Sequence, residues 1–285
     1  MEETAPPPAP KPRTGWRAEL RGWLVLILLV LGLHSLVAKP FYIPSESMMP
    51  NLLVGDRLVV SKYPYGWSYI SPSFHLLPFI EGRLFGRMPG RGDIVIVTPP
   101  AGAHDREDLI KRVIGLPGDT VQLVAGRLWL NGRPVPTRDL GDQLLPVDGN
   151  LPCDMREFPG FPDARVTGAD GKAYCRLHML RETLPNGRSY DVIDLGPGDE
   201  DDFRPYRVPA GRVFLMGDNR DDSADSRVPI ALGGLGGAVP VENIGGRAEF
   251  VTFSLNGNAT WNPLTWFSDF RGNRAGTSLR PATSR

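Results

Sequence analysis

Two side chains in this sequence could together perform nucleophilic catalysis. Ser47 lies in the segment 44–50, which reads Pro-Ser-Glu-Ser-Met-Met-Pro, and Lys111 lies in the apolar-flanked segment 109–114. A free lysine titrates near 10.4, so burial would have to lower its pKa by roughly 3 to make it an effective general base. Desolvation alone can supply such a shift. The pair predicts a serine nucleophile activated by a neutral lysine, although singly the two residues are typical of a turn serine and an edge lysine.

Other kinds of catalytic site have little support. The chain has four histidines, His34, His75, His104 and His178. None lies near a Gly-x-Ser-x-Gly elbow, and no His-Glu-x-x-His or equivalent ligand cluster exists. The segment 218–225 looks like a calcium loop, but Arg220 occupies a ligand position and the turn glycine is missing. We therefore expect no metal and no organic cofactor.

An uncharged apolar run, residues 22–38, precedes the serine. Its length is at the short end of the ~17–25 residues that a spanning helix needs. The basic residues before it are Lys11, Arg13, Arg17 and Arg21, and only Lys39 follows closely. The positive-inside rule then predicts a cytoplasmic N-terminus and an external remainder. A cleavable signal peptide is the alternative, because Leu36-Val37-Ala38 is a tolerable cleavage site.

The composition is typical of a neutral, turn-rich chain. Lys+Arg and Asp+Glu each total 32, so no basic face suggests nucleic acid as a partner. The 33 glycines and 29 prolines fit short strands better than a helical bundle. Runs rich in β-branched and aromatic residues lie at 57–63, 93–98, 120–124, 127–130 and 249–254. We expect a mostly β fold, with one hairpin turning at Asn131-Gly132.

Three features stay open at this level. Cys153 and Cys175 either pair as one disulfide in an exported domain or remain buried free thiols. The aromatic-rich segment 64–90 is either a hairpin with a small apolar cluster or an interfacial contact beside the anchor. The tail 256–285 either caps the domain or touches the membrane. The oligomeric state is not indicated.

Four segments follow the apolar run in a fixed order. They are Pro-Ser-Glu-Ser-Met-Met-Pro at 44–50, Arg-Gly-Asp-Ile-Val at 91–95, Lys-Arg-Val-Ile-Gly-Leu-Pro-Gly-Asp at 111–119 and Gly-Asp-Asn-Arg-Asp-Asp-Ser-Ala-Asp-Ser-Arg at 217–227. This combination closely resembles the bacterial type I signal peptidase (leader peptidase) family, from the anchor to about residue 254 and more weakly in the middle. The resemblance implies a retained membrane helix.

The resemblance also implies an architecture: a transmembrane helix, then an antiparallel β catalytic domain that a second β domain interrupts. The expected division is a cytoplasmic tail at 1–21, a transmembrane helix at 22–38, a first catalytic part at 39–120 with a loop or hairpin extension at 64–90, an inserted non-catalytic β domain at 121–212, a second catalytic part at 213–255 and a C-terminal tail at 256–285.

The family's catalytic roles carry over to matching positions. Ser47 resembles the nucleophile and Lys111 the general base. Ser223 resembles the residue whose hydroxyl positions the lysine amine. The Ser45 hydroxyl and the Ser47 backbone N–H resemble the oxyanion hole. By the same resemblance, the supporting charged pair is Asp225 and Arg227.

The resemblance further implies two shallow apolar pockets for small side chains, lined by Phe41, Ile43, Met48, Leu52, Ile96 and Ile110. The substrate would lie as an added strand between residues 41–44 and the segment that ends at Lys111. Two residues depart from the family pattern. Glu46 stands where a small residue is common, and Leu109 stands where an aromatic residue is common.

The function implied is a membrane-anchored serine endopeptidase that removes signal peptides from exported preproteins after an Ala-x-Ala-like site, on the outer side of the cytoplasmic membrane. Its partners would be signal peptides and the bilayer, and not nucleic acid. A self-cleaving repressor-type peptidase shares the Ser–Lys pair, but the anchor and the segment 217–227 speak against it. A catalytically silent anchored β scaffold would be expected to lack Ser47 or Lys111.

Overall fold

The computed structural model describes residues 15–71, 82–100, 107–154, 164–258 and 267–283. The described part is mostly β, as the sequence predicts, and every pairing between its named strands is antiparallel. The strands are β1 (Ala38–Tyr42), β2 (Asp56–Ser61), β3 (Ile94–Val97), β4 (Leu109–Gly115), β5 (Thr120–Val124), β6 (Arg127–Leu130), β7 (Arg133–Pro134), β8 (Thr137–Pro146), β9 (Arg165–Thr167), β10 (Ala173–Thr183), β11 (Arg188–Ile193), β12 (Phe203–Arg207), β13 (Arg212–Met216), β14 (Val239–Pro240), β15 (Ile244–Ser254) and β16 (Ala282–Thr283).

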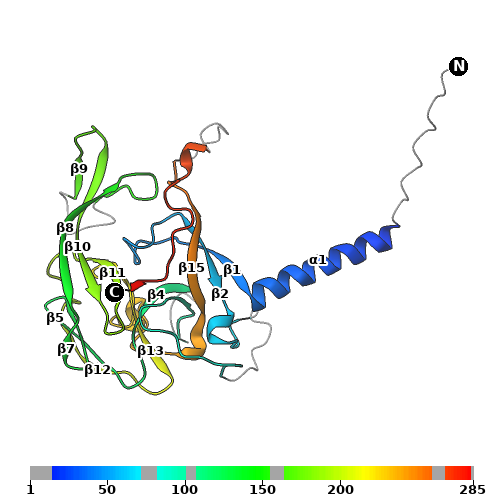
Figure 1. Ribbon diagram of the computed structural model, residues 1–285, viewed down its shortest axis with the longest axis horizontal. Helices are drawn as coiled ribbons and strands as arrows, with labels where there is room; N and C mark the ends of the chain where they lie inside the picture. Colours follow the sequence, from blue (N-terminus) through cyan, green and yellow to red (C-terminus); the bar gives the residue numbers. More distant parts are fainter. Residues whose placement is uncertain (1–14, 72–81, 101–106, 155–163, 259–266, 284–285) are drawn as a thin grey trace.

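A single long helix, α1 (Trp16–Leu36), projects from the β body in the part of the chain that the structure describes (Figure 1). Its residues are exposed or half-buried, and it is long and apolar enough to cross a membrane. The helix begins six residues earlier than the expected start at Gly22, because Arg17, Ala18 and Glu19 are good helix formers. It ends at Leu36 because β1 starts almost at once.

The largest sheet has seven strands in the order β1-β2-β15-β3-β4-β13-β14. Figure 1 shows β1 and β2 at the side of this sheet next to α1. Its strands come from three separated parts of the chain, 38–61, 94–115 and 212–254, which sheet pairing brings together. This sheet therefore joins the serine segment, the lysine strand and the strand that leads into the segment 217–227.

The intervening strands, β5 to β12, lie in two smaller sheets. One has the order β16-β11-β10-β8 with β9 paired to β10, and the other has the order β12-β5-β6-β7. The β6–β7 hairpin turns at Asn131 and Gly132, both with positive φ (54° and 73°), as the sequence predicts. The placement of these strands fits an inserted unit, and the boundaries 121 and 212 remain a prediction.

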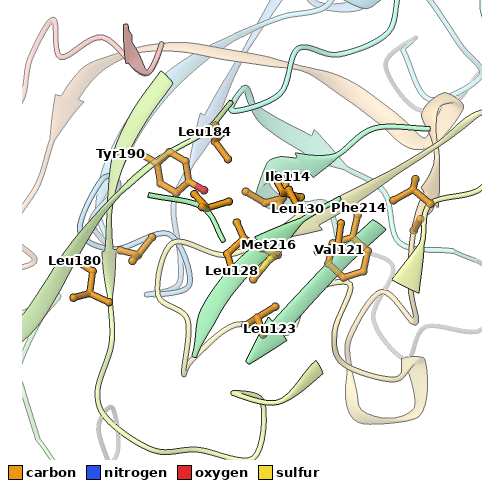
Figure 2. Close-up of a cluster of buried hydrophobic side chains, with 14 residues drawn as sticks. Ile114, Val121, Leu123, Leu128, Leu130, Leu180, Leu184, Tyr190, Phe214 and Met216 are labelled. Carbon is orange, nitrogen blue, oxygen red and sulfur yellow. The ribbon is translucent and has the colours of Figure 1, made fainter. Parts of the chain in front are cut away.

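One apolar cluster joins all three sheets (Figure 2). Ile114 on β4 and Phe214 on β13 belong to the seven-stranded sheet, Val121 to the four-stranded sheet and Tyr190 to the five-stranded sheet. These side chains are almost fully buried. Because β4 carries Lys111, this packing fixes the lysine strand against the inserted strands.

Cys153 and Cys175 form a disulfide. Of the two alternatives that the sequence left open, the structure therefore has the disulfide and not two free thiols. The two cysteines lie in an apolar cluster that also contains Met49, two residues after Ser47. The inserted strands therefore also pack against the turn that holds the serine.

Candidate active site

Ser47 and Lys111 are in direct contact. The Ser47 Oγ and Lys111 Nζ atoms lie 2.8 Å apart in a hydrogen bond, although the residues are 64 positions apart in the chain. Ser47 lies in the turn between β1 and β2 and is 8% exposed, and Lys111 lies on β4 and is 3% exposed. The structure therefore brings these two side chains together in a buried site, and their catalytic roles remain a prediction.

Burial lowers the pKa of Lys111 to about 8, because the charged ammonium loses its hydration inside the protein. Asp225, Asp218 and Asp222 oppose this effect by favouring the charged form, and Arg227 adds to it. Desolvation outweighs these charges. A pKa near 8 leaves a useful fraction of neutral amine around neutral pH, and a neutral amine can accept the serine proton.

This pKa predicts the pH dependence of the reaction. With Lys111 as the general base, the neutral amine would be the active form, so kcat/KM should fall tenfold for each pH unit below about 8, reaching roughly 1% of its plateau at pH 6. The measurement is kcat/KM against pH for one substrate. A plateau that extends unchanged down to pH 6 would contradict a lysine base.

The loop 217–227 packs directly on the serine. A Cβ added to Gly217 would lie 2.2 Å from Ser223 Oγ and 2.5 Å from the carbonyl oxygen of Ser47, so only glycine fits. The Asn219 backbone N–H donates to that same Ser47 carbonyl at 3.1 Å. Ser223 is 6% exposed, and its Oγ has no hydrogen-bond partner within the described ranges. Ser223 is thus close to the backbone of Ser47 and has a hydroxyl free to bind.

Asp225 and Arg227 hold the shape of this loop. The Asp225 carboxylate accepts the backbone N–H groups of Gly217 (2.9 Å) and Arg227 (3.0 Å) and two bonds from the Arg227 guanidinium (2.9 and 3.0 Å). Burial alone would raise the pKa of Asp225, but Arg227 and these N–H groups hold it below its usual range. The two residues form the buried pair that the sequence predicts.

A second buried network lies beneath the site, and the sequence analysis missed it. The Arg112 guanidinium donates two bonds to the Asp218 carboxylate (2.7 and 2.6 Å) and stacks 4.1 Å from the Tyr190 ring centre. Arg220 donates to the Glu182 carboxylate, which also accepts the Tyr190 hydroxyl. Arg112 and Asp218 lie in the segments 111–119 and 217–227, whose sequence pattern already marked them as part of the site. Glu182 and Tyr190 lie in the inserted strands, where no sequence motif pointed to them.

The six residues expected to line the pockets lie in one apolar cluster beside the pair. Five are buried and Phe41 packs against them; the set is Phe41, Ile43, Met48, Leu52, Ile96 and Ile110. Leu279, from the C-terminal segment, completes this cluster and was not foreseen. It is held there because its backbone N–H donates to the Glu249 carbonyl on β15.

Two strand edges beside the site are open in the described part of the chain. β1 is the terminal strand of the seven-stranded sheet and pairs on one side, with β2. β13 pairs with β4 from Arg112 onward, so residues 109–111 have no strand on the edge away from β3. An extended peptide can add to such edges through backbone hydrogen bonds.

The remaining predicted residues lie around this site or away from it. Ser45 is exposed, two residues before Ser47. His34 is on α1, and His178 lies on β10 between the surface carboxylates of Asp139 and Asp142. His75 and His104 fall outside the described residues. Over the described ranges, no group of three His, Cys, Asp or Glu side chains is placed to hold a metal ion.

Known proteins resemble this chain over most of its length. The family described as signal peptidase, peptidase S26, matches residues 16–253. The signal peptidase I of Rickettsia typhi is 35% identical over 261 residues, which cover 89% of this chain and 83% of the relative. That of Rickettsia akari is 34% identical over 87% of this chain and 84% of the relative. A solved signal peptidase I from Enterococcus faecalis matches 56% of this chain and 97% of its own, with 20% identity and a TM-score of 0.28.

Proposed function

Because this chain belongs to the signal peptidase, peptidase S26, family, we propose that it is a membrane-anchored serine endopeptidase that removes signal peptides with a Ser47–Lys111 dyad. The observation that carries the proposal is the 2.8 Å hydrogen bond between Ser47 Oγ and a buried lysine whose pKa is lowered to about 8. Incubating the purified chain with an exported precursor and determining the new N-terminus tests it.

The proposed reaction has two halves. Neutral Lys111 takes the Ser47 hydroxyl proton as the serine oxygen attacks the scissile carbonyl, and the resulting ammonium then gives this proton to the departing amine. The mature chain leaves, and the signal peptide stays as an ester on Ser47. Lys111, neutral again, takes a proton from a water molecule that attacks the ester carbon. The bond from the acyl carbon to Ser47 Oγ breaks, Lys111 returns the proton to Ser47 Oγ, and the signal peptide leaves with a free carboxyl group.

Ser223 is proposed to orient the lysine amine. Its buried hydroxyl has no hydrogen-bond partner within the described ranges and is free to bind, and the close packing at Gly217 holds it against the Ser47 backbone. Asp225 and Arg227 act one step further out, because they fix the loop that carries Ser223. These two are structural supports and touch no reacting atom in the proposed mechanism.

Ser45 is proposed to stabilise the oxyanion together with the Ser47 backbone N–H. Ser45→Ala should then lower kcat by roughly 10²–10³ with little change in KM, since the lost bond forms mainly in the transition state. Ser45→Thr keeps a hydroxyl and should retain far more activity. Both variants are to be compared by steady-state kinetics. Equal damage from the two changes would show that the side chain acts in packing.

The substrate is proposed to be an extended peptide with small side chains near the cleavage site. The open edges of β1 and of residues 109–111 can accept its backbone, and the apolar cluster around Ile43 and Ile96 can receive its alternate side chains. The side chains of this cluster are themselves buried and closely packed, so the space left for a substrate side chain is small and suits only small residues. This supports an Ala-x-Ala type of preference.

The site is proposed to work at the outer surface of the cytoplasmic membrane. The nine residue steps from Ala38 to Ser47 span at most about 30 Å. Trp67 Nε1 also donates to the Leu36 carbonyl at 2.8 Å, which holds the β body against the end of α1. A site tethered in this way stands where a signal peptide's cleavage site leaves the bilayer.

This placement predicts the result of a topology experiment. Protease added to intact spheroplasts should digest the part of the chain after residue 39 and spare the N-terminal tail, as the charge asymmetry around α1 requires. Immunoblots with tags at each end report the two fragments. If the β body were protected until the spheroplasts are lysed, the topology would be reversed.

A further inference from the structure

The C-terminal segment 277–279 extends the seven-stranded sheet next to β3. Antiparallel backbone hydrogen bonds join it to residues 249–251 of β15. β3 pairs with the preceding residues of β15, 244–247, and β2 occupies the other edge of β15. The segment therefore takes the part of this edge that β3 leaves free. Figure 1 shows it in red, crossing from β15 toward β11.

Arginine contacts hold this segment in place on both sides. Arg274 donates to the Asp56 carboxylate and, at 3.0 Å, to the Asn51 carbonyl in the turn between β1 and β2. Arg280 donates two bonds to the Glu249 carboxylate on β15 (3.0 and 2.9 Å). Beyond Arg280, β16 pairs with β11 of the five-stranded sheet. The segment is thus fixed to the serine turn, to the seven-stranded sheet and to the inserted strands.

Leu279 points from this segment into the protein. It is 5% exposed, whereas its neighbours Ser278 and Arg280 are exposed. Its side chain belongs to the apolar cluster that contains the six residues expected to line the substrate pockets. A residue from the end of the chain therefore packs against the side chains that would receive the substrate.

A cavity of about 850 Å³ borders the same cluster. Its walls include Arg181 and Asp191 of the five-stranded sheet, together with the C-terminal segment. Among the described residues, Ile94 and Leu279 are the members of the apolar cluster that also line this cavity. These two side chains therefore form the wall between the apolar cluster and the cavity.

The two wall residues differ in what holds them. Ile94 is part of β3, where it pairs with Arg112 next to Lys111. Leu279 belongs to the added segment, so truncating its side chain changes no backbone bond of β3 or β4. Removing a buried leucine side chain normally leaves a sealed void or makes its neighbours collapse into the space. At position 279 the vacated space would instead open into the existing cavity.

We propose that Leu279 is a specificity-determining residue, which limits the substrate pockets to small side chains by closing the back of their apolar cluster. The inference rests on the proposed function, since it assigns a size limit to the same pockets. Close-packed side chains can move aside for a larger guest only if there is space behind them. Leu279 fills that space, so a bulky substrate side chain meets a cluster that cannot yield.

The test uses quenched peptides with an Ala-x-Ala site in which the first or the third residue before the scissile bond is Ala, Val or Leu. The measured quantity is the ratio of kcat/KM for the Ala peptide to kcat/KM for each larger peptide, with the full-length chain in detergent. Wild type should strongly prefer Ala. Leu279→Ala should lower the ratio about tenfold at one position or both, because single methylenes in an apolar pocket discriminate by roughly this factor.

Three further variants separate pocket size from stability. Leu279→Met keeps the side-chain volume and should keep the wild-type ratio. Leu279→Val removes less volume than alanine and should lower the ratio by a few fold, which decides the question if the alanine variant does not fold. Leu128→Ala is the matched control, because Leu128 is fully buried in another cluster, on β6 of the four-stranded sheet. It should lower Tm and leave the ratio unchanged.

Two results would overturn the role of Leu279 alone. One is a ratio within about twofold of wild type at both positions in folded Leu279→Ala, or in Leu279→Val if the alanine variant does not fold. The other is an equal change of the ratio in Leu128→Ala, which would trace the effect to general loosening of the protein. Absence of any Ser47-dependent cleavage by the wild-type chain would overturn the proposed function and the size limit with it.

Discussion

Replacing Lys111 by alanine is expected to lower kcat/KM by at least ~10³-fold while the protein stays folded. Lys111 is 3% exposed and is the one lysine that the structure places in contact with the Ser47 hydroxyl, within the described ranges. Without it the serine proton has no acceptor, and the leaving amine has no donor. The measurement is kcat/KM on a peptide substrate, with circular dichroism and Tm on the same preparation.

Lys111→Met is the sharper companion variant. Methionine keeps most of the buried apolar volume but has no amine, so it should be as inactive as the alanine variant and closer to wild type in Tm. Burial of the charged Lys111 amine is unfavourable. Removing the amine therefore removes this cost, and we expect no large decrease in the stability of the variant. A folded variant of either kind with near wild-type kcat/KM would remove Lys111 from the mechanism.

Ser47→Ala is expected to have an effect of the same size. The substitution removes one buried oxygen and leaves the turn, the Met48 packing and the Asn219 bond to the Ser47 carbonyl in place. Activity should fall by at least ~10³-fold because Ser47 Oγ is the hydroxyl that is hydrogen-bonded to the lysine amine in the described part of the chain, and Ser223 is proposed only to orient that amine. Adding Lys111→Ala to it should cost little more, since the two residues act as one unit.

Ser189→Ala provides the matched control for the serine. Ser189 is partly buried on β11, and its hydroxyl bonds to Thr183, far along the chain from the dyad. Its removal should change kcat/KM by less than a few fold. A comparable loss in Ser189→Ala would mean that serine removal acts on the fold and not on the chemistry.

Much of the site could be predicted from sequence because its residues lie in short segments of unusual composition. Ser47 and Lys111 could be paired from residue type and order, and the structure places them in contact. The structure explains why the segment 217–227 begins with glycine, since any side chain at position 217 would collide with Ser223. The β class followed from short β-branched runs between turn residues.

The rest depends on packing between distant parts of the chain, which leaves no local pattern. Glu182 on β10 pairs with Arg220 in the loop 217–227, and Leu279 reaches the pocket cluster from the C-terminal segment. The pairing of Cys153 with Cys175 likewise depends on how β10 folds back over the chain. The start of α1 at Trp16 was missed because the expected helix was limited to the uncharged run, and the charged residues before that run also have good helix propensity.

The most direct test of the central claim is processing of one exported precursor by the purified full-length chain in detergent. Mass spectrometry of the product should give a single new N-terminus after an Ala-x-Ala-like site with wild type, and intact precursor with Ser47→Ala over the same time. Cleavage by folded Ser47→Ala at that site and at a near wild-type rate would contradict the Ser–Lys mechanism and the function proposed from it.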